Sequence, residues 1–305
     1  MNTASAMKYN GNVKILPELI THLSTYWPKN RADDDFALVT ERFQKAKKLE
    51  ADGYFGPATQ LALKEEINKP KPANYIIVDG IRHAVDFKVI TWEQDSFWSA
   101  YNSGNFRWRT MEVNAFVLHW DVTPSAKSTH IALCRPNRDA SVHFYGGEDG
   151  TIYQCLDAGF VRAWHAGSNG KINSRSIGIE INNPYYEKNN SKTNPRKMIK
   201  DKPVNKNVSA NYLDFHEVQK KSVLALSEAL VKVESISIPK QLPKNTNCKS
   251  HWLGDDKDPK GSILRGELSP EDIGTFAGVL GHLHFEEAKI DPGIALFEYF
   301  VSHGW

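Results

Sequence analysis

A short stretch near the C-terminus, residues 281–293, gathers side chains that can do chemistry. His282, His284, Lys289 and Asp291 follow an apolar run, Phe276 to Leu280, and the stretch ends at a Pro-Gly turn. Neutral imidazoles and carboxylates are good ligands of Zn²⁺, and a catalytic zinc ion usually keeps three protein ligands and one open position. The pattern therefore predicts a site for metal-assisted hydrolysis at the end of a strand, with one ligand supplied from elsewhere.

The best candidate for that further ligand is His119. It follows an apolar run, 114–118, that has the length and composition of a buried strand. With His282 and Asp291 it would complete a set of three ligands. His284 remains an alternative, because two residues further along a strand its side chain would point to the same face as that of His282.

Four blocks carry a resemblance to a known family. They are His119 at the end of its strand, Ala163 to Gly167, Ser176 to Glu180, and Gly281-His282 together with Lys289 to Gly293. In this order they resemble the zinc-dependent N-acetylmuramoyl-L-alanine amidases, which share their fold with the peptidoglycan-recognition proteins. The resemblance covers roughly residues 113–300.

The resemblance implies a role for each position that matches. His119, His282 and Asp291 would hold Zn²⁺, Glu180 would act as general base or proton shuttle, Lys289 would stabilise an oxyanion, and His165, Trp164 and Asn182 would bind substrate. One departure concerns Val142, which stands where many members of the family have a tyrosine, so any catalytic role of that tyrosine is absent here. For His143 and His251 a structural role is expected.

A second resemblance covers residues 12–67. Phe43-Gln44 and the turn Asp52-Gly53-Tyr54-Phe55-Gly56-Pro57-Ala58-Thr59 are similar to the signature of the three-helix peptidoglycan-binding domain. Pro17, the acidic run 33–35 and Pro57 fit the first turns of three helices. We expect residues 1–67 to form this domain, 68–74 a semi-rigid Pro- and Lys-rich linker, and 75–305 the amidase domain.

The expected fold class is α/β, with a mixed central sheet flanked by helices. Strands are predicted at 75–78, 85–90, 114–118 and 176–181, a hairpin at 141–155, and helices near 126–134 and 214–234. Residues 184–210 and 239–268 read as loop-rich insertions. Six aromatic residues between Trp92 and Trp108 favour core packing, and a platform on which sugars stack is the alternative.

Composition limits the class of protein. With 40% hydrophobic and 24% charged residues and a net charge of +2, the chain reads as an ordinary soluble protein, too weakly basic to indicate nucleic acid as a partner. Three widely spaced cysteines do not suggest disulfides or a metal site. Residues 1–11 lack the pattern of a secretory signal, and no apolar run is long enough for a membrane span. We expect a monomer made in a host cytoplasm that acts on the cell wall.

Together these features predict a peptidoglycan hydrolase that cleaves the amide bond between N-acetylmuramic acid and L-alanine, in the manner of a phage endolysin. Two alternatives remain. One is a peptidoglycan-recognition protein without catalytic activity, and the other is a zinc peptidase that cuts within the stem peptide.

Overall fold

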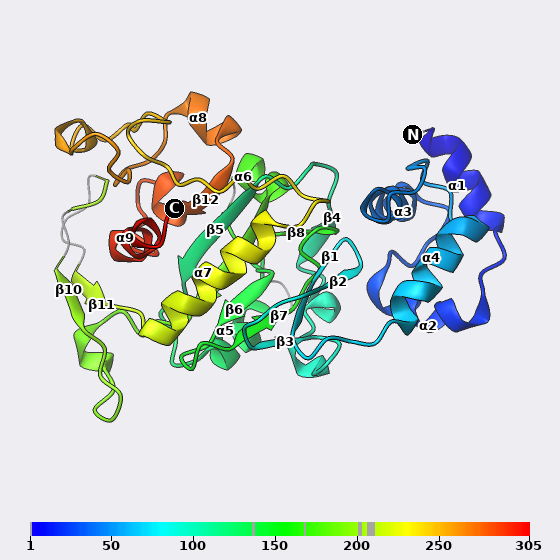
Figure 1. Cartoon of the computed structure of the whole chain (residues 1–305), viewed down its shortest axis with the longest axis horizontal. Coiled ribbons are helices and arrows are strands. Elements are labelled where there is room, and N and C mark those ends of the chain that lie inside the picture. The colour runs from blue at the N-terminus through cyan, green and yellow to red at the C-terminus, as the bar shows by residue number, and fades with distance from the viewer. Residues whose placement is uncertain (1, 136–137, 168, 201–202, 206–210) are drawn as a thin grey trace.

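The fold is built around a mixed sheet (Figure 1) in a computed structural model that describes residues 2–135, 138–167, 169–200, 203–205 and 211–305. Within these residues six strands pair in the order β12-β5-β9-β6-β7-β3. They are β3 (Val89–Thr91), β5 (Ala115–Trp120), β6 (Phe144–Gly146), β7 (Ile152–Gln154), β9 (Ser176–Ile181) and β12 (Gly278–Gly281). The pairs β12-β5, β5-β9, β9-β6 and β7-β3 are parallel, whereas β6 and β7 form an antiparallel hairpin. This confirms the α/β class and the predicted hairpin.

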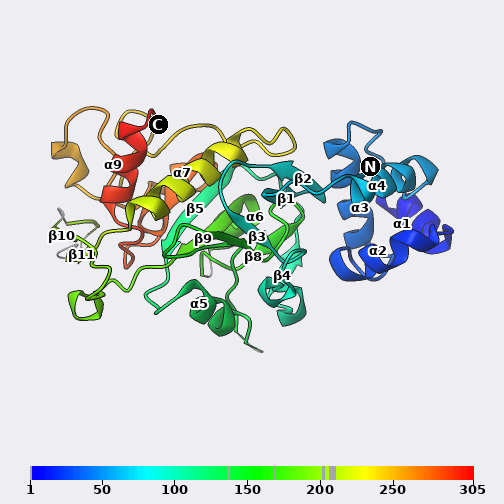
Figure 2. The same ribbon diagram turned by 60° about the horizontal axis from the view of Figure 1, so that its bottom comes forward.

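Helices cover both faces of the sheet (Figure 2). On one face α7 (Glu217–Val231) and α9 (Ile294–Ser302) share a core with Phe116, Leu118 and Trp120 of β5. On the other face lie α5 (Ala126–Leu133) and α6 (Gly170–Arg175). Side chains alternate along a strand, so His119 of β5 points away from α7, toward the α5 and α6 side.

Shorter elements surround this sheet. Two-stranded pairs are formed by β1 (Tyr75–Val78) with β2 (Ile81–Ala84), β4 (Phe106–Trp108) with β8 (Val161–Ala163), and β10 (Met198–Lys200) with β11 (Asn211–Leu213). Single 3₁₀ turns are η2 (Ser96–Trp98), η3 (Tyr101–Ser103), η4 (Glu187–Asn189), η5 (Asp255–Lys257) and η6 (His282–His284), and α8 (Pro270–Thr275) is a short helix. Within the described ranges, no helix combines the length and apolar composition needed to cross a lipid bilayer.

Two predictions differ from these elements. The strand expected at 85–90 is replaced by β2 and β3 on either side of a bend at 86–87. The alternation of Val85, Phe87 and Val89 with polar residues suits a strand, but the Val85 N–H bonds to the Asn74 carbonyl, whereas Val89 pairs with Ile152 of β7, so the chain changes its partner between them. The insertion at 184–210, expected as a loop, contains β10; its residues 201–202 and 206–210 lie outside the described part of the chain. The insertion at 239–268 is loop-rich as predicted, with only a 3₁₀ turn and isolated bridges.

The N-terminal region is helical. Its elements are α1 (Thr3–Asn12), η1 (Pro17–Leu19), α2 (Ile20–Tyr26), α3 (Asp34–Ala46) and α4 (Pro57–Asn68). Pro17 and Pro57 stand in first turns, and the Asp33 carboxylate accepts the Phe36 N–H as an N-cap. These three starts confirm the sequence prediction.

The Phe-Gln motif of α3 has a clear structural role. The Gln44 amide donates to Asp52 and to the carbonyl of Tyr54, and its oxygen accepts the Gly53 N–H at 2.8 Å. One buried side chain thus fixes the whole Asp-Gly turn. Helix α1 was not predicted, since its buried surface is small, but Asn10 anchors it through a 2.8 Å bond from its amide to the Gly53 carbonyl.

The N-terminal helices pack directly against the sheet-containing part. Trp27 lies with its ring centroid 5.6 Å from that of Phe160, and both side chains belong to one continuous hydrophobic cluster. Arg42 of α3 adds a 2.8 Å ion pair with Asp79. The expected spacer at 68–74 therefore joins two parts that share a core, instead of holding two modules apart.

Two buried polar side chains tie β8 to β9. The Arg109 guanidinium donates to the carbonyls of Val161, Ser174 and Ser176 at 2.6–2.8 Å. His143 accepts the Gly178 N–H at Nδ1, and its Nε2 donates to the carbonyl of Val161. This satisfied arrangement confirms the structural role expected for His143.

The shared core predicts the cost of removing Phe160. Its ring is 1% exposed and packs on Trp27, so Phe160→Ala should lower the free energy of unfolding by about 3–5 kcal/mol. Urea unfolding followed by tryptophan fluorescence measures this. Leu61→Ala on α4 is the control, since a side chain that is 55% exposed should change stability by no more than about 0.5 kcal/mol. Equal effects of the two substitutions would contradict the shared core.

His143 predicts a pH dependence of stability. Burial, followed by the nearby Arg109 charge, lowers the pKa of His143 to about 3, below the value of about 6.5 expected in the unfolded chain. The contribution of His143 to the free energy of unfolding is therefore fully present above pH ~6.5. It is lost as the pH falls toward 3, at up to about 1.4 kcal/mol per pH unit. His143→Gln removes this proton uptake, so its stability should fall less steeply between pH 6 and 4 than that of the wild type. Parallel pH profiles from urea titrations would refute the assignment.

Candidate metal centre

Two parallel strands bring the predicted histidines together. In the pairing of β12 with β5, Gly281 lies opposite Leu118, so the next residues, His282 and His119, follow side by side at the same edge of the sheet. Both side chains are buried, at 7% and 2% exposure. The sequence places them 163 positions apart, and the register alone makes them neighbours.

Asp291 joins them from the loop before α9. Its backbone carbonyl accepts the Leu283 N–H at 3.1 Å, which holds the loop against η6. Gly281 permits this approach, because a Cβ at that position would lie 2.6 Å from Cδ of Pro292. The carboxylate is thereby fixed beside the two imidazoles.

The three side chains have the geometry of a metal site. His119 Nδ1 lies 3.0 Å from His282 Nδ1 and 3.2 Å from Asp291 Oδ2, and His282 Nδ1 lies 3.3 Å from the same oxygen. A tetrahedral zinc ion with ligands at 2.0–2.1 Å requires ligand atoms about 3.3 Å apart. The donor set therefore fits zinc, and it forms the metal-capable cluster found among the described residues.

The protonation states also suit a metal. Burial lowers the pKa of His119 to about 4, which leaves its imidazole neutral near pH 7. Burial alone would raise the pKa of Asp291, but the contacts of its carboxylate with His119 and His282 outweigh burial and hold the pKa below its usual value. Neutral imidazole and ionised carboxylate are the forms that bind metal ions.

A chain of hydrogen bonds orients His119. Its Nε2 lies 3.1 Å from Nδ1 of His165, and Nε2 of His165 lies 3.0 Å from the Ser176 hydroxyl. With His119 donating from Nε2, its Nδ1 is left unprotonated toward His282 and Asp291. Gly178 makes room for this chain, since a Cβ there would lie 2.5 Å from the His165 ring.

His282 has an outer partner that the sequence analysis missed. Its Nε2 donates to the Glu286 carboxylate at 2.9 Å, which directs Nδ1 toward the other ligands. The sequence signal for this partner is the spacing of four residues between His282 and Glu286.

His284 is not part of the centre, contrary to the alternative raised from the sequence. Its Nδ1 accepts the Gly281 N–H at 2.8 Å and its Nε2 donates to the Leu264 carbonyl at 2.9 Å. The strand ends at Gly281, and residues 282–284 form the 3₁₀ turn η6, so the alternation that would align His284 with His282 is broken.

The ligand cluster opens into a cavity of about 660 Å³ that also receives the two predicted catalytic residues. Glu180 stands opposite His119 in the β5-β9 register and on the same face of the sheet. Lys289 precedes Asp291 in the same loop and is half-buried. The structure thus brings Glu180 and Lys289 together with His119, His282 and Asp291.

Glu180 is held in an unusual electrostatic environment. Burial, followed by the charges of Asp121 and Asp291, raises the pKa of its carboxyl group well above the ordinary value, and Lys289 opposes this rise. Its Oε2 has no hydrogen-bond partner among the described residues. A partnerless carboxyl oxygen in a cavity is available to accept or deliver a proton.

Of the three predicted substrate-binding residues, two line this cavity. His165 does so from behind His119, and Trp164 lies at the cavity wall with the Arg162 guanidinium 4.3 Å from its ring centroid. Asn182 does not. Its amide donates to Asp121 and to the carbonyl of Thr123 at 2.9 Å, and it lines neighbouring cavities, so its role in substrate binding stays a prediction.

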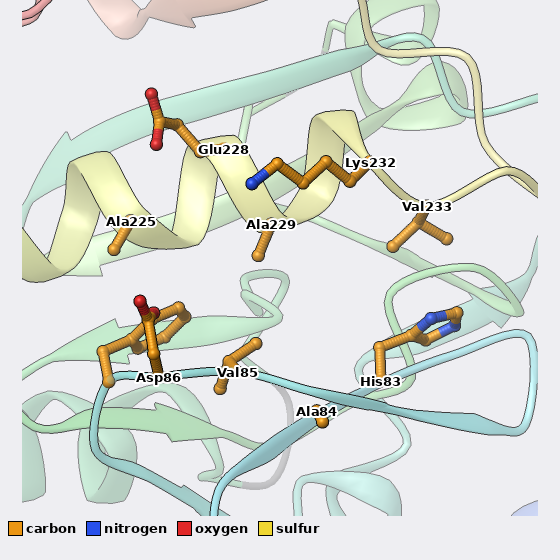
Figure 3. A pocket seen from close by; sticks show the side chains of 10 residues that line it. His83, Ala84, Val85, Asp86, Ala225, Glu228, Ala229, Lys232 and Val233 are labelled. Carbon is orange, nitrogen blue, oxygen red and sulfur yellow. The ribbon is translucent and has the colours of Figure 1, made fainter.

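A further cavity of about 540 Å³ lies between α7 and residues 83–87 (Figure 3). Ala225 and Ala229 face Val85 across it, with Glu228 and Lys232 along the helix. None of the three candidate metal ligands lines this cavity.

Solved structures resemble this chain only distantly. The amidase AmiD from E. coli, in complex with an anhydro-N-acetylmuramic acid peptide substrate, is 17% identical with a TM-score of 0.33, over 63% of this chain and 57% of AmiD. Drosophila PGRP-SA is 15% identical with a TM-score of 0.38, over 72% and 91% of the two chains. The endolysin amidase LysCS from Clostridium intestinale URNW is 16% identical with a TM-score of 0.34, over 72% and 96%. Similarities at this level carry no argument here, and no curated protein matches the chain.

The sequence itself gives a firmer result. A family model described as N-acetylmuramoyl-L-alanine amidase, Amidase_2, matches residues 109–294, which is more than half of the chain and spans every candidate ligand. The chain therefore belongs to the Amidase_2 family of N-acetylmuramoyl-L-alanine amidases.

Proposed function

We propose that this protein is a zinc-dependent amidase that cleaves the bond between N-acetylmuramic acid and L-alanine in peptidoglycan. The observation that carries the proposal is the convergence of His119, His282 and Asp291 in one cavity with Glu180. Family membership supplies the substrate class, and the cavity supplies the groups that such a hydrolysis needs.

His119, His282 and Asp291 would hold the zinc ion. When bound there, zinc would supply Lewis acidity toward a carbonyl oxygen and toward water. The protein's own contribution is to fix three ligand atoms with a spacing of 3.0–3.3 Å and to keep the His119 imidazole neutral.

Glu180 and Lys289 would act on the reacting groups. The raised pKa of Glu180 suits a carboxylate that takes a proton from the attacking water and delivers it to the departing amine of L-alanine. The Lys289 ammonium group would stabilise the oxyanion that forms on the scissile carbonyl. Trp164 and His165 would line the path of the substrate.

Two alternatives can be weighed against the same site. A recognition protein without catalytic activity does not need a complete ligand set, and here all three positions carry metal-binding side chains within 4.8 Å of one another. A peptidase acting within the stem peptide would use the same centre on a neighbouring amide, so only the reaction product distinguishes it.

We further propose a lytic role, with the N-terminal helices contributing to wall binding. The support is the resemblance of residues 12–67 to a peptidoglycan-binding domain, whose Phe43-Gln44 signature forms the buried hub described above. Loss of turbidity in a suspension of permeabilised bacteria after addition of the protein tests this role.

Digestion of purified peptidoglycan tests the reaction. The holoenzyme should release stem peptides that begin with L-alanine and leave the glycan strands intact, as read by mass spectrometry. A chelator should abolish the release, and added zinc should restore it. Peptides cut internally would support the peptidase, and new reducing ends on the glycan would reject both.

Paired substitutions separate catalysis from metal binding. Glu180→Gln should retain one bound zinc per chain and lose at least about 10²-fold in turnover, because the proton transfer disappears while the ligands remain. Asp291→Asn should lose both zinc affinity and turnover. Metal content by atomic emission and peptide release measure the two effects, and a Glu180→Gln protein without zinc would make Glu180 a structural residue.

A further inference from the structure

A separate cavity, of about 490 Å³, lies between α2 and the aromatic segment 92–108, where the N-terminal helices meet the sheet-containing part. It shares no lining residue with the metal cavity. Its wall is unusually aromatic, being formed by Tyr26, Trp27, Trp92, Tyr101, Phe106 and Trp108.

Two of these aromatic residues carry donors without acceptors. Trp27 and Trp92 are 2% and 4% exposed, yet the indole Nε1 of each has no hydrogen-bond partner among the described residues. Buried donors are almost always paired, with protein, water or ligand. Two unpaired N–H groups on the wall of one cavity indicate that a molecule bound there would supply acceptors.

The remaining wall defines what that molecule would be. Tyr101, Phe106 and Trp108 are half-buried and offer apolar ring surface to the cavity. Hydroxyl and amide groups line it as well, from Ser24, Thr25, Ser96, Ser99 and Asn102. Lys29 is the one charged residue in the described lining, so the cavity suits a neutral ligand with an apolar face and several hydroxyl or carbonyl oxygens.

The position of the cavity relates it to the metal centre. Phe106 in β4 pairs with Ala163 in β8, and the next residue, Trp164, lines the metal cavity. Phe106 itself lines the cavity beside α2. The two cavities therefore lie along one two-stranded ribbon, an arrangement that suits a polymer whose backbone and side branch occupy different sites.

We propose that this cavity binds a neutral N-acetylated saccharide, a segment of the peptidoglycan glycan strand. The choice of peptidoglycan as its source rests on the proposed function. Sugar C–H faces pack on Tyr101, Phe106 and Trp108, and acetamido carbonyl or hydroxyl oxygens accept from the indoles of Trp27 and Trp92. This goes beyond the amidase reaction, because it assigns the recognition of the glycan to the junction of the two parts of the chain.

The test uses the full chain and a β-1,4-linked tetramer of N-acetylglucosamine, which lacks the amide cleaved at the metal centre. Titration is followed by the indole N–H signals in ¹⁵N-labelled protein, which has eight tryptophans. Trp→Phe variants at 27, 92 and 305 assign the signals. The signals of Trp27 and Trp92 should shift saturably on titration.

Trp305 provides an internal control. Its Nε1 is also buried without a partner, but it lies at the C-terminus, outside this cavity. Its signal should stay in place at every saccharide concentration. A shift of Trp305 equal to those of Trp27 and Trp92 would indicate a nonspecific response and would overturn the proposal.

Variants test the aromatic wall. Trp108→Ala should weaken binding by about tenfold or more, and Asn102→Ala, at an exposed rim position, should weaken it severalfold with the fold intact. Phe97→Ala is the matched control, since this ring is 39% exposed and does not line the cavity, and it should bind like the wild type. Circular dichroism checks the folding of each variant.

Absence of any indole shift at millimolar tetramer would overturn the proposal, whether or not the protein releases stem peptides. Unchanged affinity in folded Trp108→Ala and Asn102→Ala would do the same, as would a response to an apolar peptide and none to the saccharide. Saccharide binding by a protein that releases no stem peptide would instead refute the amidase and leave the saccharide site standing.

Discussion

The parallel pairing of β12 with β5 is the constraint on which the candidate centre depends. It sets the ends of two strands level, so that His119 and His282 follow at the same edge with their Nδ1 atoms 3.0 Å apart. Pairing of β9 with β5 then adds Glu180 opposite His119. A slip of one residue in either register would turn a functional side chain to the other face of the sheet. The pairing of the strands thus determines which side chains meet at the site.

Hydrogen bonds around the paired strands orient the side chains of the candidate metal ligands. The chain from His119 through His165 to Ser176 and the bond from His282 to Glu286 both direct unprotonated ring nitrogens inward. Burial keeps the His119 imidazole neutral, and the contacts with His119 and His282 hold the pKa of Asp291 below its usual value. The same burial leaves Glu180 with a raised pKa. One low-dielectric cavity therefore shifts the pKa values of its two acids in opposite directions, according to the partners each one has.

Much of this could be predicted from the sequence, because strand ends and helix starts leave local signals. Apolar runs placed His119 and Glu180 at strand ends, and Pro17, Asp33 and Pro57 marked three helices. The misses have physical reasons. The sequence left His284 open as an alternative ligand because the 3₁₀ turn that replaces the strand there has no local signal, and α1 was overlooked because it buries little apolar surface. The packing of Trp27 on Phe160 depends on residues far apart in the chain, and no local pattern reports such a contact.

That contact has a consequence for modular engineering. The exchange of domains between wall-active enzymes assumes that each domain is structurally independent. Here the excision of residues 1–67 would uncover the rings of Phe160, Trp92 and Tyr101 and would leave Asp79 without its arginine counterion. A truncated or chimeric protein would expose an apolar patch that promotes aggregation. Transfer of the sheet-containing part to another protein must therefore include the N-terminal helices or replace the exposed apolar residues with hydrophilic ones.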